Sequence, residues 1–120
     1  MSVRELRRKE FCSRGRVVLN WSHYVACLFA GMFLANAVPH LVQGICGNRF
    51  PTPFAKPPGR GLSSPVVNAV WGLVNLVAGT ILFRIGRVSG WDTAGVVVFF
   101  VGVAIISVGS SVNFAHKDVA

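Results

Sequence analysis

The stretch that decides the fold is VVLNWSHYVACLFAGMFLANAVPHLVQGICGN, residues 17 to 48, which contains no Asp, Glu, Lys or Arg. Residues 61–83 and 93–116 are also free of these four residue types, and the three stretches together cover 79 of the 120 positions. A helix that crosses a hydrocarbon layer of about 30 Å needs roughly 20 mainly apolar residues, so each stretch has room for one span. The sequence therefore predicts an all-α integral membrane bundle of three transmembrane helices.

The overall composition agrees with a membrane protein. Hydrophobic residues make up 52% of the chain and charged residues 13%, against about 25% charged residues in soluble domains. We expect one membrane domain with a basic N-terminal segment at 1–21, spans at 22–45, 65–83 and 93–113, a proline-rich outer loop at 46–64, an inner turn at 84–92 and an outer tail at 114–120.

The positive charges predict an orientation. Eight Lys and Arg residues lie on the side of the N-terminus, namely Arg4, Arg7, Arg8, Lys9, Arg14, Arg16, Arg84 and Arg87. The other side holds four, namely Arg49, Lys56, Arg60 and Lys117. This bias predicts that the N-terminus lies in the cytoplasm and the C-terminus outside. Basic residues next to a span also favour anionic lipid headgroups, whereas nucleic acid is not an expected partner.

Two features near the start of the chain leave alternatives open, and Pro39 adds a prediction of its own. The basic start, the apolar run and Ala35-Asn36-Ala37 also resemble a signal peptide with its cleavage site. The basic segment itself is either a weakly amphipathic helix on the membrane surface or a solvated tail. Pro39 removes one helical hydrogen bond, which predicts a kink near Asn36.

The three cysteines are expected to lie at different depths. Cys12 is placed inside, Cys27 within the first span and Cys46 outside. Since a disulfide needs Cα atoms within about 7 Å, no intramolecular disulfide is predicted. Cys46 is either a free thiol or a link between two copies.

Small residues recur at intervals of seven in the second and third spans. Five glycines follow this spacing, namely Gly72, Gly79, Gly95, Gly102 and Gly109. Asn68 and Asn75 share the spacing and the face of the glycines in the second span. Small residues are the usual material of helix contacts in membranes. Because the connection at 84–92 is short, we expect spans 2 and 3 to form an antiparallel hairpin with close backbone approach.

Polar residues collect in the outer half of the bundle. Asn36, His40 and Gln43 share one face of the first span, at the depth of Asn68, and with Asn75 they form the candidate intramembrane site. Ser107, Ser110 and Ser111 are expected nearby. The cluster either holds helices together by hydrogen bonds or lines a small polar cavity gated by the loop. His40 is expected to be a neutral hydrogen-bonding residue, and no metal or cofactor is predicted.

The outer loop carries two phenylalanines among prolines. We expect Phe50 and Phe54 to rest on the membrane interface or to cover the outer helix ends. Ser64-Pro65 is a good helix start, and Asp92 is expected to act as the N-cap of the third span.

Four short motifs resemble those of a set of small, uncharacterised bacterial integral membrane proteins. They are Asn36-Ala37-Val38-Pro39-His40, Phe50-Pro51-Thr52-Pro53-Phe54, Ser63-Ser64-Pro65 and Asn68-Ala69-Val70-Trp71-Gly72. The resemblance implies a bacterial inner-membrane location and brings no activity. The chain is also similar in size to four-helix small multidrug exporters, but it lacks the acidic residue in the first span on which those exporters depend.

Two hypotheses of function follow. The first is a structural or assembly component that packs with copies of itself or with a larger membrane complex, since three spans bury little surface unaided. The second is a small transporter or ligand-binding protein that uses the outer polar cluster around His40. An enzyme is not expected, because the chain has no phosphate loop and its four acidic residues, Glu5, Glu10, Asp92 and Asp118, lie at the polar margins.

Overall fold

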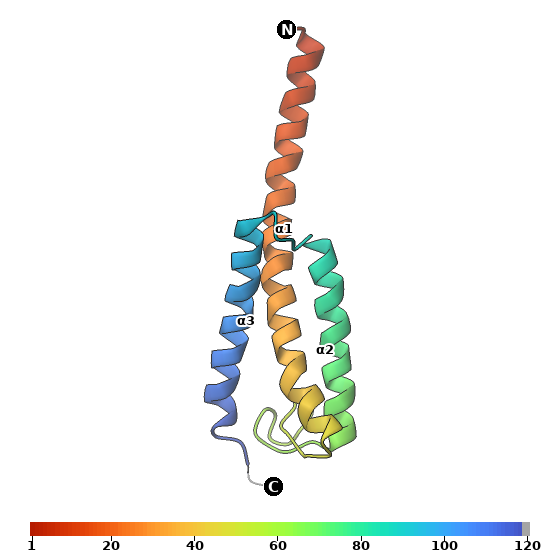
Figure 1. Cartoon of the computed structure of the whole chain (residues 1–120), viewed down its shortest axis with the longest axis vertical. Coiled ribbons are helices and arrows are strands. Elements are labelled where there is room, and N and C mark those ends of the chain that lie inside the picture. The colour runs from red at the N-terminus through yellow and green to blue at the C-terminus, as the bar shows by residue number, and fades with distance from the viewer. Residues whose placement is uncertain (119–120) are drawn as a thin grey trace.

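The protein is a bundle of long helices. A computed structural model describes residues 1–118, apart from the side chains of residues 12–20. Within this part of the chain, helix α1 spans Val3–Ile45, α2 spans Pro65–Ile85 and α3 spans Thr93–Phe114 (Figure 1). The segments Trp21–Ile45, Pro65–Ile85 and Thr93–Phe114 are each long and apolar enough to cross a membrane. The predicted all-α fold with three candidate spans is confirmed to this extent.

Each helix begins at a side chain that caps it. Ser2 and Glu5 form a reciprocal capping box at the start of α1. Ser64 accepts from the amide of Val67, with Pro65 at the first helical position of α2. The Asp92 carboxylate accepts from the amide of Gly95 at the start of α3. The predicted caps of the second and third spans are therefore confirmed.

Helix α1 is much longer than a single span. It continues without interruption from the basic segment into the bundle, and its N-terminal half extends beyond the other two helices (Figure 1). Eighteen residues precede Trp21 in this helix, which corresponds to about 27 Å at 1.5 Å per residue. Residues 1–11 are exposed. The segment is thus a helical extension of the first span, and its two expected positions, on the membrane surface or in solvent, stay predictions.

The arrangement of the helices differs from the predicted hairpin. Helices α2 and α3 each pack against α1, and within residues 1–118 their backbones do not approach each other. Side chains of α2 and α3 do meet where the rings of Phe83 and Phe99 lie 5.5 Å apart. Figure 1 shows α1 running between α2 and α3. The predicted close backbone approach of spans 2 and 3 is therefore wrong, because α1 occupies the space between them.

The glycines explain why α1 takes the central position. On α2 a side chain carbon at Gly72 would come within 2.8 Å of the Leu41 backbone nitrogen, and one at Gly79 within 3.0 Å of that of Leu34. On α3 a side chain carbon at Gly102 would collide with the carbonyl of Leu28. On α1, a side chain carbon at Gly31 would likewise collide with the carbonyl of Phe99. The close contacts therefore join α1 to each neighbour.

The predicted packing positions on α2 and α3 differ in how deeply they are buried and in what surrounds them. Asn68, Gly72, Asn75 and Gly79 are buried along one seam of α2. Gly95 is buried on α3 beside Asp92 and His23. Gly109 is exposed, and nothing lies within 4 Å of a side chain carbon placed there.

The two ends of the bundle hold different connections. The loop end carries residues 46–64, where Phe50 and Ser63 pair through their backbones, and the amide of Asp118 in the tail donates to the Arg60 carbonyl. The turn end carries the connection between α2 and α3. Helix α1 remains helical through Pro39, and beyond it the yellow end of α1 leans toward the loop end of α2 (Figure 1).

Candidate functional site: a cavity beneath the 46–64 loop

Four of the five predicted polar residues meet in pairs between α1 and α2. The Nδ1 atom of His40 lies 2.9 Å from Oδ1 of Asn68. The Nδ2 group of Asn36 donates to Oδ1 of Asn75 at 3.0 Å. Gln43 is half-buried and does not join these pairs. The polar cluster therefore holds the two helices together, as the first of the two interpretations expected.

Asn68 connects both helices to the loop. Its side chain is fully buried, and its Nδ2 group lies within hydrogen-bond distance of the carbonyl oxygens of Phe50 at 2.9 Å, Ser63 at 3.2 Å and Ser64 at 3.1 Å. These acceptors determine which side of the amide carries the nitrogen. The Asn68 oxygen therefore faces His40, and His40 Nδ1–H must be the donor.

This arrangement determines the tautomer of His40. With the proton on Nδ1, the Nε2 atom carries a lone pair and can accept a hydrogen bond. The ring is almost completely buried at 2% exposure. The rings of Phe50 and Phe114 lie edge-on to it, with centroids at 5.5 and 6.2 Å. His40 is thus a neutral side chain whose second nitrogen is available as an acceptor.

A cavity of about 340 Å³, open on one side and mainly apolar in its lining, lies beside this network. Asn36 and His40 of α1 and Trp71 of α2 form part of its wall, and the rest comes from Pro51, Thr52, Pro53, Pro58, Gly59, Asn113 and Phe114. No lining residue carries a formal charge. The Nε1–H group of Trp71 is buried and has no acceptor within the described residues. Trp71 and His40 thus both contribute to the wall of this cavity.

The two loop phenylalanines take separate positions around this cavity. Phe50 is buried against His40 and Phe114, whose ring centroid lies 4.7 Å from its own. Phe54 is exposed and lies edge-on to Trp71 at 5.2 Å. Phe50 thus covers the ends of the helices, which is one of the two positions expected for the loop phenylalanines.

The serines of α3 do not join the polar cluster. Ser107, Ser110 and Ser111 line a separate groove of about 400 Å³ between α1 and α3, opposite Ala35 and Pro39. Pro39 has no amide hydrogen, so the Ala35 carbonyl lacks its usual helical donor. The groove is open and mainly apolar, with these few polar groups along it.

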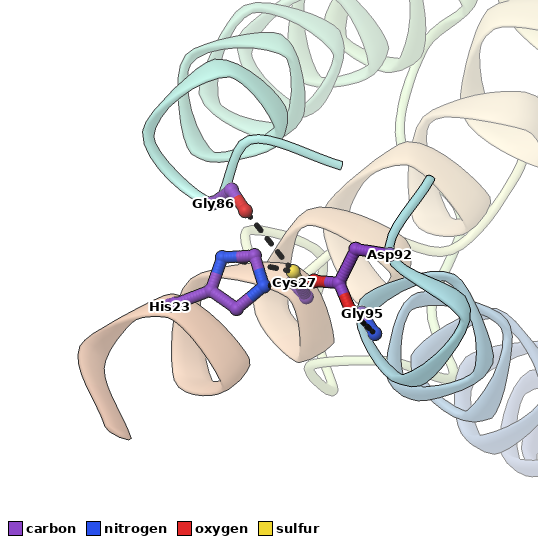
Figure 2. A network of polar contacts seen from close by, with 5 residues as sticks. All are labelled: His23, Cys27, Gly86, Asp92 and Gly95. Atoms are coloured by element: carbon purple, nitrogen blue, oxygen red, sulfur yellow. Dashed lines mark hydrogen bonds and ion pairs between the residues drawn. The ribbon is translucent and has the colours of Figure 1, made fainter. Parts of the chain in front are cut away.

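A second network lies at the turn end and was not anticipated from the sequence. Figure 2 shows it where α1, the residue that follows α2 and the start of α3 meet. Nε2 of His23 forms a short contact with a carboxylate oxygen of Asp92. The Cys27 thiol donates to the Gly86 carbonyl at 3.4 Å, and its sulfur lies 4.0 Å from Nδ1 of His23. The only signal in the sequence was the spacing of His23 and Cys27, four residues apart on one helical face.

This second network is a tie between α1 and α3, formed by His23 and Asp92. Within the described residues no group of three or more His, Cys, Asp or Glu side chains could hold a metal ion. Cys27 is fully buried and Cys46 is exposed, and both are free thiols. The prediction for Cys12 falls on a side chain outside the described residues. Asp92 therefore does more than cap α3, since it also binds α1 through His23.

Asp92 gives this tie a defined pH dependence. The Gly95 amide and the His23 side chain lower the pKa of the Asp92 carboxyl. The folded protein thus holds the ionised form more strongly than the unfolded chain does. This stabilisation is complete above pH about 4, the ordinary pKa of Asp, and is lost as the pH falls through the lowered pKa.

Replacing Asp92 by Asn should lower the thermal midpoint at pH 7 and remove the part of the acid dependence that comes from this carboxyl. Thermal unfolding in detergent, followed by circular dichroism from pH 7 to pH 2, measures both effects. Asp118→Asn, in the tail at the opposite end, serves as the matched control. Equal acid sensitivity of the Asp92→Asn variant and the unmodified protein would show that the tie contributes nothing.

Comparisons with known proteins do not add to this description. No protein-family model matches the chain, and neither the curated proteins nor the solved structures contain a significant match. The evidence on function therefore comes from the chain itself.

Proposed function

We propose that this chain is a multi-pass membrane protein that binds a small molecule in the cavity beneath the 46–64 loop. The observation that carries this proposal is the buried Trp71 N–H without an acceptor, on the wall of a cavity that His40 also lines. A buried donor left without a partner costs about 1–3 kcal/mol, which a ligand with an acceptor recovers. A cavity of about 340 Å³ also has the size of known small-molecule sites.

The proposed location is the inner membrane of a bacterium, with the N-terminus in the cytoplasm and the cavity outside. The excess of Lys and Arg at the N-terminal side supports this orientation. Anionic headgroups are proposed partners of the basic segment. Lys9 lies twelve residues before Trp21 in one continuous helix, or about 18 Å. Because the screening length is about 8 Å, this attraction is confined to the cations nearest the span.

The proposed activity is binding or transport and not catalysis. The cavity wall offers neutral donors and acceptors, and its lining residues include no Asp, Glu, Lys or Cys beside His40. General acid–base chemistry depends on a positioned group whose pKa is near the working pH, commonly with a second group that orients it. The donor and acceptor set described here is suited to recognition.

Occupation of the cavity can be measured with Trp71 as the reporter. In a Trp21→Phe, Trp91→Phe background, titration with small aromatic solutes should change Trp71 emission in a saturable way. Asn113→Phe adds a ring to the cavity wall and should weaken this binding at least tenfold. Asn48→Phe makes the same substitution at an exposed residue that does not line the cavity, and should leave binding unchanged. Absence of any saturable response across the solutes would refute the proposal.

A second candidate function is assembly with another copy or a larger membrane complex. It is favoured by the thin packing of α3, since 11% of its most apolar stretch is buried within the chain against 33% for α1. The exposed surface of α3 includes Ser107, Gly109 and Ser111. Small and polar residues are the usual material of helix contacts in a membrane. The groove between α1 and α3 adjoins this surface.

Crosslinking tests the assembly candidate. In a background without the native cysteines, Ser107→Cys should form disulfide-linked dimers in membranes under mild oxidation. Val101→Cys, exposed on a different face of α3, provides the control and should remain monomeric. Equal crosslinking at both positions would indicate random collision and not an interface.

A further inference from the structure

We infer that the ligand of the cavity beneath the loop is a neutral molecule with a hydroxyl or amide group, which donates to His40 Nε2 and accepts from Trp71 Nε1–H. This inference rests on the proposed binding function and specifies its chemistry. It follows from the orientation of three side chains.

The acceptor on His40 is set by a chain of hydrogen bonds that begins at the loop. The Asn68 amino group faces three carbonyl oxygens, so turning the amide around would place its oxygen against all three. The Asn68 oxygen consequently accepts a hydrogen bond from His40 Nδ1–H. A neutral imidazole has one proton, so Nε2 is left as an acceptor, and His40 lines the cavity.

The donor on Trp71 is set by its covalent structure. The indole nitrogen can donate and cannot accept. Its N–H is buried without a partner among the described residues, and the side chain belongs to the same cavity wall. The backbone carbonyl of Trp71 already accepts from Asn75 at 2.7 Å. A single group that both donates and accepts, such as a hydroxyl or an amide, satisfies His40 and Trp71 together.

The residues that line the cavity also indicate the charge of the ligand and the character of its non-polar part. No lining residue is charged, and the nearby cations Lys56 and Arg60 are not part of the wall. An ion would lose its hydration here without gaining a counter-charge, which costs far more than burial of a neutral hydroxyl. Phe114 and the loop prolines offer apolar surface. An aromatic or aliphatic body with one neutral polar group therefore fits the wall.

Fluorine NMR with matched probes tests this inference in the full-length protein in detergent. We use 4-fluorophenol, which donates and accepts, 4-fluoroanisole, which only accepts, fluorobenzene, which does neither, and 4-fluorobenzoate, which is charged. 4-Fluorophenol should bind at least about tenfold more tightly than 4-fluoroanisole, since the ether cannot donate to His40. 4-Fluorobenzoate should bind more weakly than either.

The Trp71 contact is tested by substitution. Trp71→Phe keeps an aromatic ring beside Phe54 but removes the N–H. It should weaken 4-fluorophenol about tenfold and leave fluorobenzene unchanged. Trp91→Phe, at a residue 99% exposed near the turn end, is the control and should alter neither.

The outcomes separate the inference from the proposed function. Equal affinities for 4-fluorophenol, 4-fluoroanisole and fluorobenzene would leave cavity binding intact but overturn the hydrogen-bonding inference. Tighter binding of 4-fluorobenzoate than of 4-fluorophenol would also overturn that inference. Absence of saturable binding by any probe would overturn both. Binding experiments in bilayer nanodiscs show whether the ligand comes from the lipid or from free solution. Displacement of 4-fluorophenol by 4-dodecylphenol indicates a lipid-borne hydroxyl, and binding of the short phenol alone indicates a free solute; either result supports the stated chemistry.

Discussion

Replacing Asn68 by Ala is expected to lower the free energy of unfolding by about 2–4 kcal/mol, because the change leaves His40 Nδ1–H without its acceptor and removes a donor shared by three carbonyls. The loop should also detach from α2, since two of those carbonyls belong to Phe50 and Ser63. Unfolding by sodium dodecyl sulfate from detergent micelles, followed by circular dichroism, measures the loss.

The matched control for this substitution is Thr80→Ala on the same helix. The Thr80 hydroxyl donates to the Leu76 carbonyl within α2 and makes no contact across helices in the hydrogen bonds described. Its removal should cost less than about 0.6 kcal/mol, the average for polar contacts between helices in a membrane, because this bond lies within one helix. A loss at Asn68 no greater than at Thr80 would mean that the polar cluster does not hold the loop end together.

Replacing Gly102 by Val is expected to be the most damaging change in α3. A side chain carbon at this position collides with the backbone carbonyl of Leu28 on α1, and a backbone atom cannot rotate away. Overpacking in a tight core costs typically about 1–3 kcal/mol, and a collision with backbone belongs at or above the upper end. The expected result is separation of α3 from α1, with loss of the tie between His23 and Asp92. The same detergent unfolding experiment measures it.

Gly109 supplies the control, because nothing lies within 4 Å of a side chain carbon at that position. Gly109→Ala should leave stability unchanged or raise it by up to about 1 kcal/mol through helix propensity. Gly72→Val extends the test to α2, where it should disrupt the contact with Leu41.

Had spans 2 and 3 packed on each other, disulfides between cysteines placed on facing positions of α2 and α3 would form readily. The α1-centred arrangement predicts that they do not.

The helices and their starts could be predicted because those signals are local. A stretch without charges long enough to cross a bilayer is visible in composition alone, and Ser64-Pro65 and Asp92 are caps that act within three residues. The seam of α2 was also visible, since Asn68, Gly72, Asn75 and Gly79 recur at helical spacing. A glycine stripe shows that another backbone comes close, but it does not show which one. The short connection between spans 2 and 3 favours α3 as that partner, whereas in the structure the partner is α1.

The candidate sites show the same division. The polar character of the His40 region was evident, but the pairing with Asn68, the tautomer of His40 and the unpartnered Trp71 N–H depend on how two helices and a loop are placed. The tie between His23 and Asp92 joins residues 69 positions apart, and nothing near either residue indicates the other.

By itself the sequence determined that this protein has three apolar helices, where they start, and which faces carry small or polar side chains, because those properties depend on residues within one or two turns. Only the tertiary structure decided that α1 is the central helix and that a cavity lined by His40 and Trp71 lies beneath the loop. Contacts and empty volume are properties of several segments at once, and they follow from how closely backbones can approach in three dimensions.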